Sequence, residues 1–330
     1  MKSVTVIDAP RQIVGTESVG RLIGPLLAGA AGWRIIQVYR HCFYCLSDAG
    51  DVICIGDASI DRGPFTIICT EAVAAAAAAQ AGNRDIVSND GTMLLGDRLV
   101  IDTTRSALWV ADFFNCGGSG ANLDPVLSML TETAGSTAPQ QSLGSLLPAL
   151  FTRELVDQKR AATTAVLHRR LLQVVDSVRR DSAFADPERL ASLLIPLIGL
   201  GYGLTPSGDD FCAGSVLSLV AVGKPEQAVV LARNLFQAAR NRTTVISLAF
   251  YRALGASLLF ESQARLLGCI GDQQDPDLGD ALHGVYRHGA TSGWDLLAGF
   301  AFGLDLFSHE KQLSEPVGSA GGWFSQRRTG

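Results

Sequence analysis

Hydrophobic residues follow two different periods along this chain. In the first third, short apolar and aromatic runs such as residues 33–46 alternate with turns such as residues 48–51. Runs of this length, bounded by Gly, Asp and Pro, are typical of β-strands, and closely spaced short strands favour a small barrel or sandwich. From residue 146 onward, apolar positions recur at helical spacing instead, which predicts a helical second half.

The same pattern predicts the individual elements. Strands are expected at 33–46, 52–55 and 65–69, a hairpin at 94–102, and a short buried helix in the Ala-rich segment 71–80. A weak helical pattern covers 124–131, and stronger helices are expected at 156–180, 187–198, 211–222, 225–241, 245–259, 278–288 and 294–307. The sequence therefore predicts an α+β protein, with a β-rich domain at 1–117, a linker region at 118–145, a helical ligand-binding domain at 146–313 and a disordered tail at 314–330.

One short sequence occurs twice in the helical half. Residues 207–214 and 292–299 share five of eight positions, and each copy has Ser first and Asp three residues later. This spacing resembles a capping box and predicts a helix N-terminus in each copy. Each copy also ends in Gly, which costs a helix about 1 kcal/mol relative to Ala. The matched glycines indicate that the two helices pack closely, so that their N-termini converge on a possible anion site.

The first copy has an unusual approach, with glycines at every second position: Gly199, Gly201 and Gly203. Gly permits positive φ and close contact between backbone and ligand. Pro206 suits the first turn of a helix capped by Thr205, and Asp209 and Asp210 fall in that turn, where the dipole favours carboxylates. The acidic pair can alternatively serve only to stabilise the helix. The segment is neither a Rossmann fingerprint nor a P-loop, because no strand leads into it and the Lys is missing.

A third segment has the same polar character. Thr243 or Thr244 is expected to cap another helix, with Ser247 one turn further on. Arg242 is a natural partner for a carboxylate or phosphate, although a solvated surface arginine is an equally simple reading.

The sequence contains one candidate metal site, for magnesium. Adjacent acids beside a phosphate site can hold magnesium, so Asp209 and Asp210 are the expected ligands. Cys42 and Cys45 are three residues apart in a β-like run, which places them on opposite faces and favours buried thiols over zinc. Seven irregularly spaced cysteines suit a reducing compartment, and together with the lack of a targeting pattern at the N-terminus they predict a cytoplasmic protein.

Composition excludes several classes of function. A formal net charge of −5 and the absence of basic runs argue against binding to nucleic acid. The apolar stretch 23–31 is too short and too rich in Gly to span a membrane. No nucleophile elbow is present, so covalent catalysis is not indicated. Hydroxyls, helix N–H groups, an arginine and carboxylates instead suit phosphoryl or carbamoyl transfer, which depends on positioning and charge.

Three segments together, 203–210, 243–247 and 290–299, resemble domain-of-unknown-function family 2877, which includes the AllH-type subunit of oxamate carbamoyltransferase. The resemblance covers about residues 195–305. It implies a subunit of a transferase of anaerobic allantoin catabolism, a branch of purine degradation, in which oxalurate and phosphate give oxamate and carbamoyl phosphate. The implied partners are an FdrA-like subunit, related to acyl-CoA synthetases, and a second uncharacterised subunit.

The motifs and the resemblance together predict a site for a small anionic substrate. Asp209, Asp210 and Asp295 are the expected catalytic residues, with magnesium on the first two. The expected anion-binding residues are Gly201, Gly203, Thr205, Ser207, Gly208, Arg242, Thr243, Thr244, Ser247, Thr291, Ser292 and Gly293. One alternative is a non-catalytic subunit or sensor that binds a nucleotide or acyl phosphate, and another is a scaffold in which these residues only hold helices.

Overall fold

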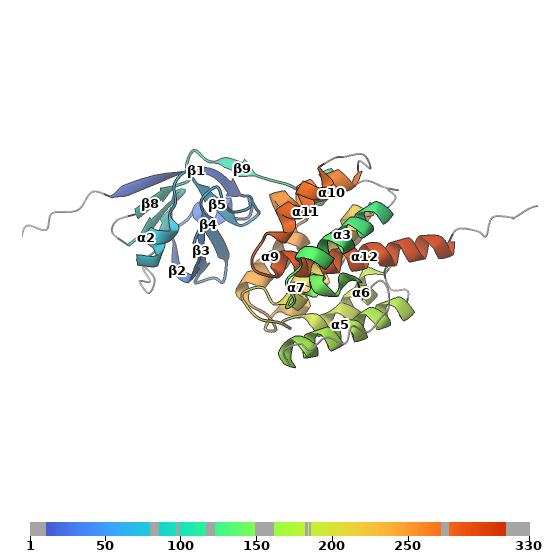
Figure 1. Ribbon diagram of the computed structural model, residues 1–330. Coiled ribbons are helices and arrows are strands. Elements are labelled where there is room, and N and C mark those ends of the chain that lie inside the picture. Colours follow the sequence, from blue (N-terminus) through green and yellow to red (C-terminus); the bar gives the residue numbers. More distant parts are fainter. Residues whose placement is uncertain are drawn as a thin grey trace, which may run out of the picture.

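A β-barrel and a group of helices make up the molecule (Figure 1). The computed structural model describes residues 11–79, 86–96, 99–116, 123–148, 162–181, 184, 186–271 and 277–314. The predicted α+β class is therefore confirmed, with strands first and helices after them. Ser314, the first residue of the tail predicted at 314–330, is the last residue of α12. Residues 315–330 of that tail and residues 156–161 of the predicted helix lie outside the described residues.

The barrel consists of eight strands and is extended by a ninth. The strands are β1 (Gln12–Gly20), β2 (Ala31–Val38), β3 (Cys42–Ser47), β4 (Val52–Gly56), β5 (Thr66–Cys69), β6 (Ile86–Asn89), β7 (Thr92–Leu95), β8 (Leu99–Asp102) and β9 (Ala107–Trp109). They lie in the order β5-β4-β3-β2-β6-β7-β8-β1, and a pairing between β5 and β1 closes the barrel, while β9 adds to β1 in parallel. Closure decides between the two predicted architectures in favour of a barrel.

Two features of the barrel differ from the predicted strands. The run at 33–46 is divided into β2 and β3, which pair as a hairpin around Tyr39, with its N–H bonded to the Cys42 carbonyl at 2.7 Å. A second hairpin, β6–β7, was not predicted, although its Asp90-Gly91 turn is a common hairpin signal. Both turn residues have positive φ, 46° and 79°. The predicted hairpin at 94–102 is confirmed as β7 and β8.

The helical part is built around two buried helices, α7 (Ser207–Ala221) and α12 (Ser292–Ser314). The remaining helices are α1 (Gly24–Leu27), α2 (Ala74–Ala79), α3 (Asp124–Thr137), α5 (Ala162–Asp181), α6 (Pro187–Leu194), α8 (Pro225–Ala239), α9 (Val245–Gly255), α10 (Glu261–Gly271) and α11 (Leu278–Tyr286), with the short 3-10 turns η2 (Leu143–Leu146) and η4 (Ile195–Leu197). α7 has almost no amphipathic face, which is typical of a helix surrounded by others. The predicted helices are confirmed with shifts at their ends, whereas α1 and α10 were not predicted. Helices α1 and α2 pack in the barrel core and not in the helical part.

The segment predicted as a linker, 118–145, contains α3. This helix contacts α12, and its Val126 and Leu130 are buried in the same core as α7 and α12. The helical core therefore extends N-terminal of residue 146, and the division into domains stays a prediction.

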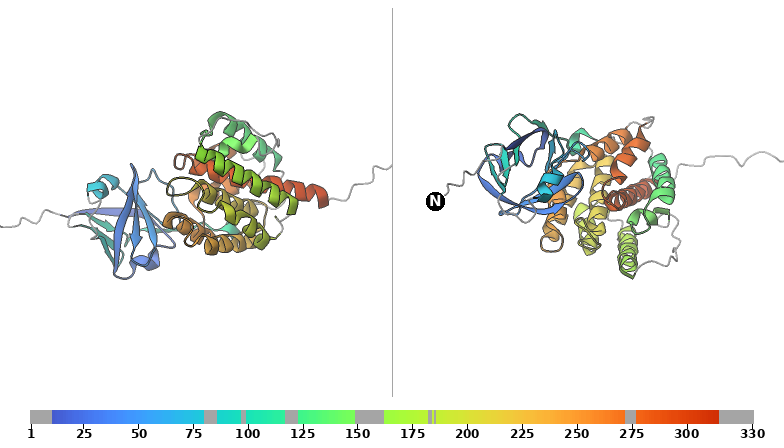
Figure 2. Two further views of the ribbon diagram at one scale, coloured as in Figure 1. Left: turned by 90° about the horizontal axis from the view of Figure 1, so that it is seen from below. Right: turned by 60° about the vertical axis from the view of Figure 1, so that its left-hand side comes forward.

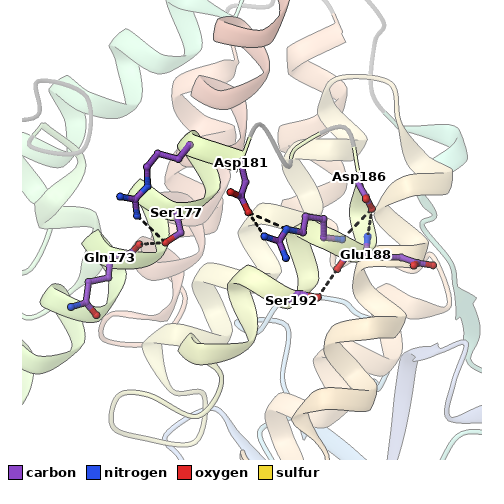
Figure 3. A network of polar contacts seen from close by, with 8 residues as sticks. Gln173, Ser177, Asp181, Asp186, Glu188 and Ser192 are labelled. Atoms are coloured by element: carbon purple, nitrogen blue, oxygen red, sulfur yellow. Dashed lines mark hydrogen bonds and ion pairs between the residues drawn. The ribbon is translucent and has the colours of Figure 1, made fainter.

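A polar network fixes the corner between α5 and α6 (Figure 3). The Asp186 side chain accepts hydrogen bonds from the backbone N–H groups of Glu188 and Arg189, which makes it the N-cap of α6. The Arg189 side chain is paired with Asp181 at the end of α5. The cap and the ion pair therefore hold the two helix ends together across a short connection.

Helix α9 and the start of α10 attach the helical part to the barrel (Figure 2). The Phe65 ring of the barrel contacts the rings of Phe250 and Phe260 at centroid distances of 5.1 and 5.3 Å. Beside them, the Glu261 N–H donates to the Arg62 carbonyl at 2.9 Å. This aromatic junction therefore attaches the loop before β5 to α9 and to the residue before α10.

Candidate functional site

Helices α7 and α12 pack together through their glycines, as the repeat predicts. A Cβ added to Gly214 would lie 1.9 Å from the Leu296 carbonyl oxygen, and one added to Gly299 would lie 1.9 Å from that of Phe211. Phe211 and Leu296 occupy equivalent positions in the two copies. The two helices are therefore related by a local two-fold arrangement, and only Gly permits this distance.

The N-termini of the two helices bring the Ser of each copy to the Asp of the other. The Ser292 hydroxyl lies beside the Asp210 carboxyl, and the Ser207 hydroxyl lies beside the Asp295 carboxyl. Thr205 Oγ1 lies 2.7 Å from Ser292 Oγ. Each Asp thus has the Ser of the other copy as a neighbour, and the two carboxyl groups lie close together between the helix ends.

Two details of the predicted caps are wrong. α7 begins after Pro206, which occupies the N-cap position without a side-chain hydrogen bond, so Thr205 is not the cap. Ser207 is the first helical residue, and its hydroxyl lies beside the Asp295 carboxyl. The reason is tertiary, because the fold brings a buried carboxyl from the other helix to this hydroxyl, while the backbone N–H groups of residues 208–210 already donate to carbonyl oxygens.

Burial favours the protonated form of both carboxyl groups. Desolvation, followed by the charge of Asp295, raises the pKa of Asp210 well above its usual value, although the Ser292 and Thr205 hydroxyls oppose this. Desolvation raises the pKa of Asp295 to about 6, although the Leu143 N–H and the Ser207 hydroxyl act to lower it. Oδ2 of Asp210 and Oδ2 of Asp295 are buried without a hydrogen-bond partner. The pair therefore retains a proton near neutral pH.

Asp295→Asn is expected to make stability less dependent on pH. The Asp295 carboxyl is fully buried, and its pKa is raised from 3.8 to about 6, so its favourable contribution is complete below about pH 4 and lost above about pH 6. Between pH 4 and 7 the wild type should lose about 3 kcal/mol of unfolding free energy more than the variant. Denaturant unfolding at several pH values measures this difference, and parallel curves would contradict it.

Asp209 points away from Asp210 and has a different role. Its carboxylate accepts hydrogen bonds from the Thr243 hydroxyl, the Tyr251 hydroxyl at 3.1 Å and the Gly199 N–H at 3.2 Å. Both oxygens of Asp209 are thus used within the protein, so the two acids do not fit a shared magnesium ion. In the described part of the chain, no three His, Cys, Asp or Glu side chains form a metal-binding group.

The third segment, residues 243–247, contacts the glycine-rich loop. Thr244 caps α9, as predicted, because its hydroxyl accepts from the Ser247 N–H, and it also donates to the Leu204 carbonyl. Ser247 is buried, and the Arg242 side chain is exposed. A Cβ on Gly199, whose φ is 77°, would lie 2.1 Å from the Arg242 carbonyl oxygen. The loop at 199–205 is therefore fixed against the start of α9.

A cavity of about 720 Å³ lies between the barrel and the helix N-termini. The predicted residues that line it are Gly201, Gly203, Thr205, Ser207, Asp210, Thr291, Ser292 and Gly293. The other predicted residues, Gly208, Asp209, Arg242, Thr243, Thr244, Ser247 and Asp295, do not line it. The barrel contributes Tyr39, His41, Cys42, Tyr44, Cys54 and Asp61 among others, and Arg287 and His288 also line the cavity.

Free N–H groups are scarcer at this site than the two helix ends suggest. The Gly208 N–H donates to the Leu200 carbonyl at 2.8 Å, and the Gly293 N–H donates to the His288 carbonyl at 3.0 Å. The space between the two N-termini is itself taken by Asp210 and Asp295. Sequence reasoning missed Arg287, an exposed side chain on the cavity wall that can attract an anion there.

Comparison with known proteins agrees with the position of this site. No helix within the described ranges is long and apolar enough to cross a membrane. No solved structure matches the chain. The family model for oxamate carbamoyltransferase subunit AllH matches residues 197–304, which include the glycine loop, α7 and the N-terminus of α12. The resemblance predicted from three motifs is thereby confirmed, and residues 197–304 are similar to this family.

Proposed function

We propose that this chain is a subunit of a carbamoyltransferase complex and that its cavity binds a small carboxylate or phosphate substrate. The observation that carries the proposal is the coincidence of the matched segment with the helical wall of the cavity, where Asp210 and Ser292 lie. Oxalurate and phosphate, or oxamate and carbamoyl phosphate, are the substrates that suit the family description. FdrA-like and second uncharacterised subunits are the partners proposed for the assembly.

The carboxyl pair suits the proton requirement of this reaction. Transfer of a carbamoyl group from oxalurate to phosphate breaks a C–N bond, and the leaving nitrogen must gain a proton. Asp210 faces the cavity, and its pKa is raised by burial and by Asp295. A carboxyl group that keeps its proton near neutral pH is a suitable general acid. We assign this role to Asp210. The charge of Asp295 helps to keep the Asp210 carboxyl protonated.

Arg287→Ala is expected to weaken anion binding. Oxamate, phosphate or carbamoyl phosphate at about one hundred times its dissociation constant should add roughly 2.7 kcal/mol to stability, a shift of several degrees in a thermal-shift assay. The variant should lose most of this shift, because the charge on the cavity wall is removed. Arg242→Ala is the matched control, since this exposed arginine does not line the cavity. Equal shifts in both variants would place the anion elsewhere.

The transferase role is tested in the assembled complex. The chain, co-expressed with the FdrA-like and second subunits, should form carbamoyl phosphate from oxalurate and phosphate. If carbamoyl phosphate formation stops when this chain is omitted, the proposal is supported. If it continues at the same rate, the proposal is contradicted.

A second candidate, a non-catalytic subunit that binds a nucleotide or acyl phosphate, is favoured by the size of the cavity. It predicts a thermal shift with such ligands and transfer activity that survives replacement of Asp210.

A further inference from the structure

A histidine and an aspartate from different halves of the molecule meet at the cavity wall. His288 follows the C-terminal end of α11, and its Nε2 lies 3.5 Å from Oδ2 of Asp61, which belongs to the loop between β4 and β5. Both side chains line the same cavity as Asp210 and Ser292. None of the motifs in the helical half contains either residue, so the pair is visible only in the folded protein.

Both residues of the pair are held in place independently. The Asp61 carboxylate accepts hydrogen bonds from the Ser262 hydroxyl at 2.7 Å and from its N–H at 3.2 Å, which ties the barrel loop to the first turn of α10. The His288 carbonyl accepts from the Gly293 N–H, which ties the histidine to the start of α12. The pair therefore forms where the barrel and the helices are fixed to one another, as expected for a positioned functional group.

The surroundings favour a neutral imidazole beside an ionised carboxylate. Burial, and then the charge of Arg287, lower the pKa of His288 to about 4. Burial raises the pKa of Asp61 to about 6, with Glu261 raising it further and Ser262 and Arg287 opposing. Asp210 also faces this cavity from α7. Nε2 is the ring nitrogen that faces Asp61, at 3.5 Å, so above pH 6 the Nε2–H tautomer turns its N–H toward the carboxylate and leaves the Nδ1 lone pair available to accept a proton.

We propose that His288 is the general base of the transfer reaction and that Asp61 positions it; this inference rests on the proposed function. His288 Nδ1 takes the proton of hydrogen phosphate as a phosphate oxygen bonds to the carbamoyl carbon. The C–N bond of oxalurate then breaks, its electron pair stays on nitrogen, and Asp210 gives that nitrogen a proton. One proton thus moves from phosphate to oxamate, and no oxidant or further reactant is needed. His288 and Asp210 lie on different walls of the cavity, as expected when the base acts on the attacking phosphate and the acid acts on the leaving nitrogen.

His288→Gln tests the role of the base. In the assembled complex, this variant should lower kcat by about 10²-fold or more, with little change in KM, because general-base catalysis contributes on that scale. The matched control is His283→Gln, since His283 is exposed on α11, five residues before His288, and does not line the cavity. Asp61→Asn should lower kcat less and change the pH profile, as expected for a positioning residue. Wild-type kcat in both His variants would overturn the proposal.

The orientation of the imidazole is tested in the purified full chain, without any reaction. NMR of ¹⁵N-labelled histidine should give the Nε2–H tautomer for His288 at neutral pH, and Asp61→Ala should produce a mixture of tautomers. A dominant Nδ1–H tautomer in the wild type would overturn the proposal even with an active complex. Absence of transfer by the wild-type complex overturns the proposed function itself, whereas transfer with unchanged His288→Gln kinetics overturns only the base.

Discussion

Gly214→Ala is expected to unfold the helical part or to lower its stability by about 3 kcal/mol or more, and Gly299→Ala should do the same. In each case the new methyl group would lie 1.9 Å from a backbone carbonyl oxygen of the opposite helix. A backbone atom in a buried helix cannot turn aside as a flexible side chain can, so α7 and α12 would have to separate along their length. Loss of the helical signal at a lower denaturant concentration measures the effect.

The matched control for this prediction is Gly268→Ala. Gly268 lies within α10, and a Cβ there would meet no heavy atom within 4 Å. Because Ala favours a helix over Gly by about 0.5–1 kcal/mol, this variant should be neutral or slightly more stable. If Gly214→Ala behaved like Gly268→Ala, the close packing of the two helices would be contradicted.

Asp210→Asn is expected to lower the rate of carbamoyl transfer by about 10²- to 10⁴-fold, the range that general acid catalysis contributes. Asn keeps the size of Asp and can still accept the hydrogen bond from Ser292, but it has no proton to give the leaving nitrogen. The fold should be retained, because the Asn side chain is uncharged like the protonated Asp210 and is close to it in size. Steady-state kinetics of the assembled complex, with thermal unfolding of the same sample, separates lost chemistry from lost structure.

The control for the second prediction is Asp280→Asn, which removes one negative charge at an exposed position in the first turn of α11. This variant should transfer at the wild-type rate. A fully active Asp210→Asn enzyme would remove the acid assignment and would favour a binding role for the cavity.

Most of what could be predicted about the site from the sequence came from the repeat at 207–214 and 292–299. Matched glycines seven residues after each Ser predicted the pairing of α7 and α12, because Gly in a helix is unfavourable unless close packing requires it. The identity of each Ser partner was not predictable. A hydroxyl at a helix start has a local candidate in its own backbone, and only the fold brings Asp295 to Ser207.

Residues without a local motif were missed for a related reason. Arg242 directly precedes a recognisable cap and was predicted to bind the anion, whereas Arg287 and Asp61 lie in ordinary helix-end and turn sequences. Their place at the cavity depends on how the barrel meets α10 and α11. The barrel itself was predictable as a class, but its closure depends on the pairing of β1 with β5, which are distant in sequence.

Long-range hydrogen bonds at the N-terminus of α12 also constrain the order of folding. Thr205 and Ser292 are 87 residues apart in sequence, and Leu143 and Asp295 are 152 apart. Contacts of such long range form late, after the intervening chain has been ordered. During synthesis, the apolar surface of α7 and the Asp210 side chain therefore stay exposed until α12 has left the ribosome and can pack against them. Premature termination before residue 292 should thus give an aggregation-prone product rather than a partly active one.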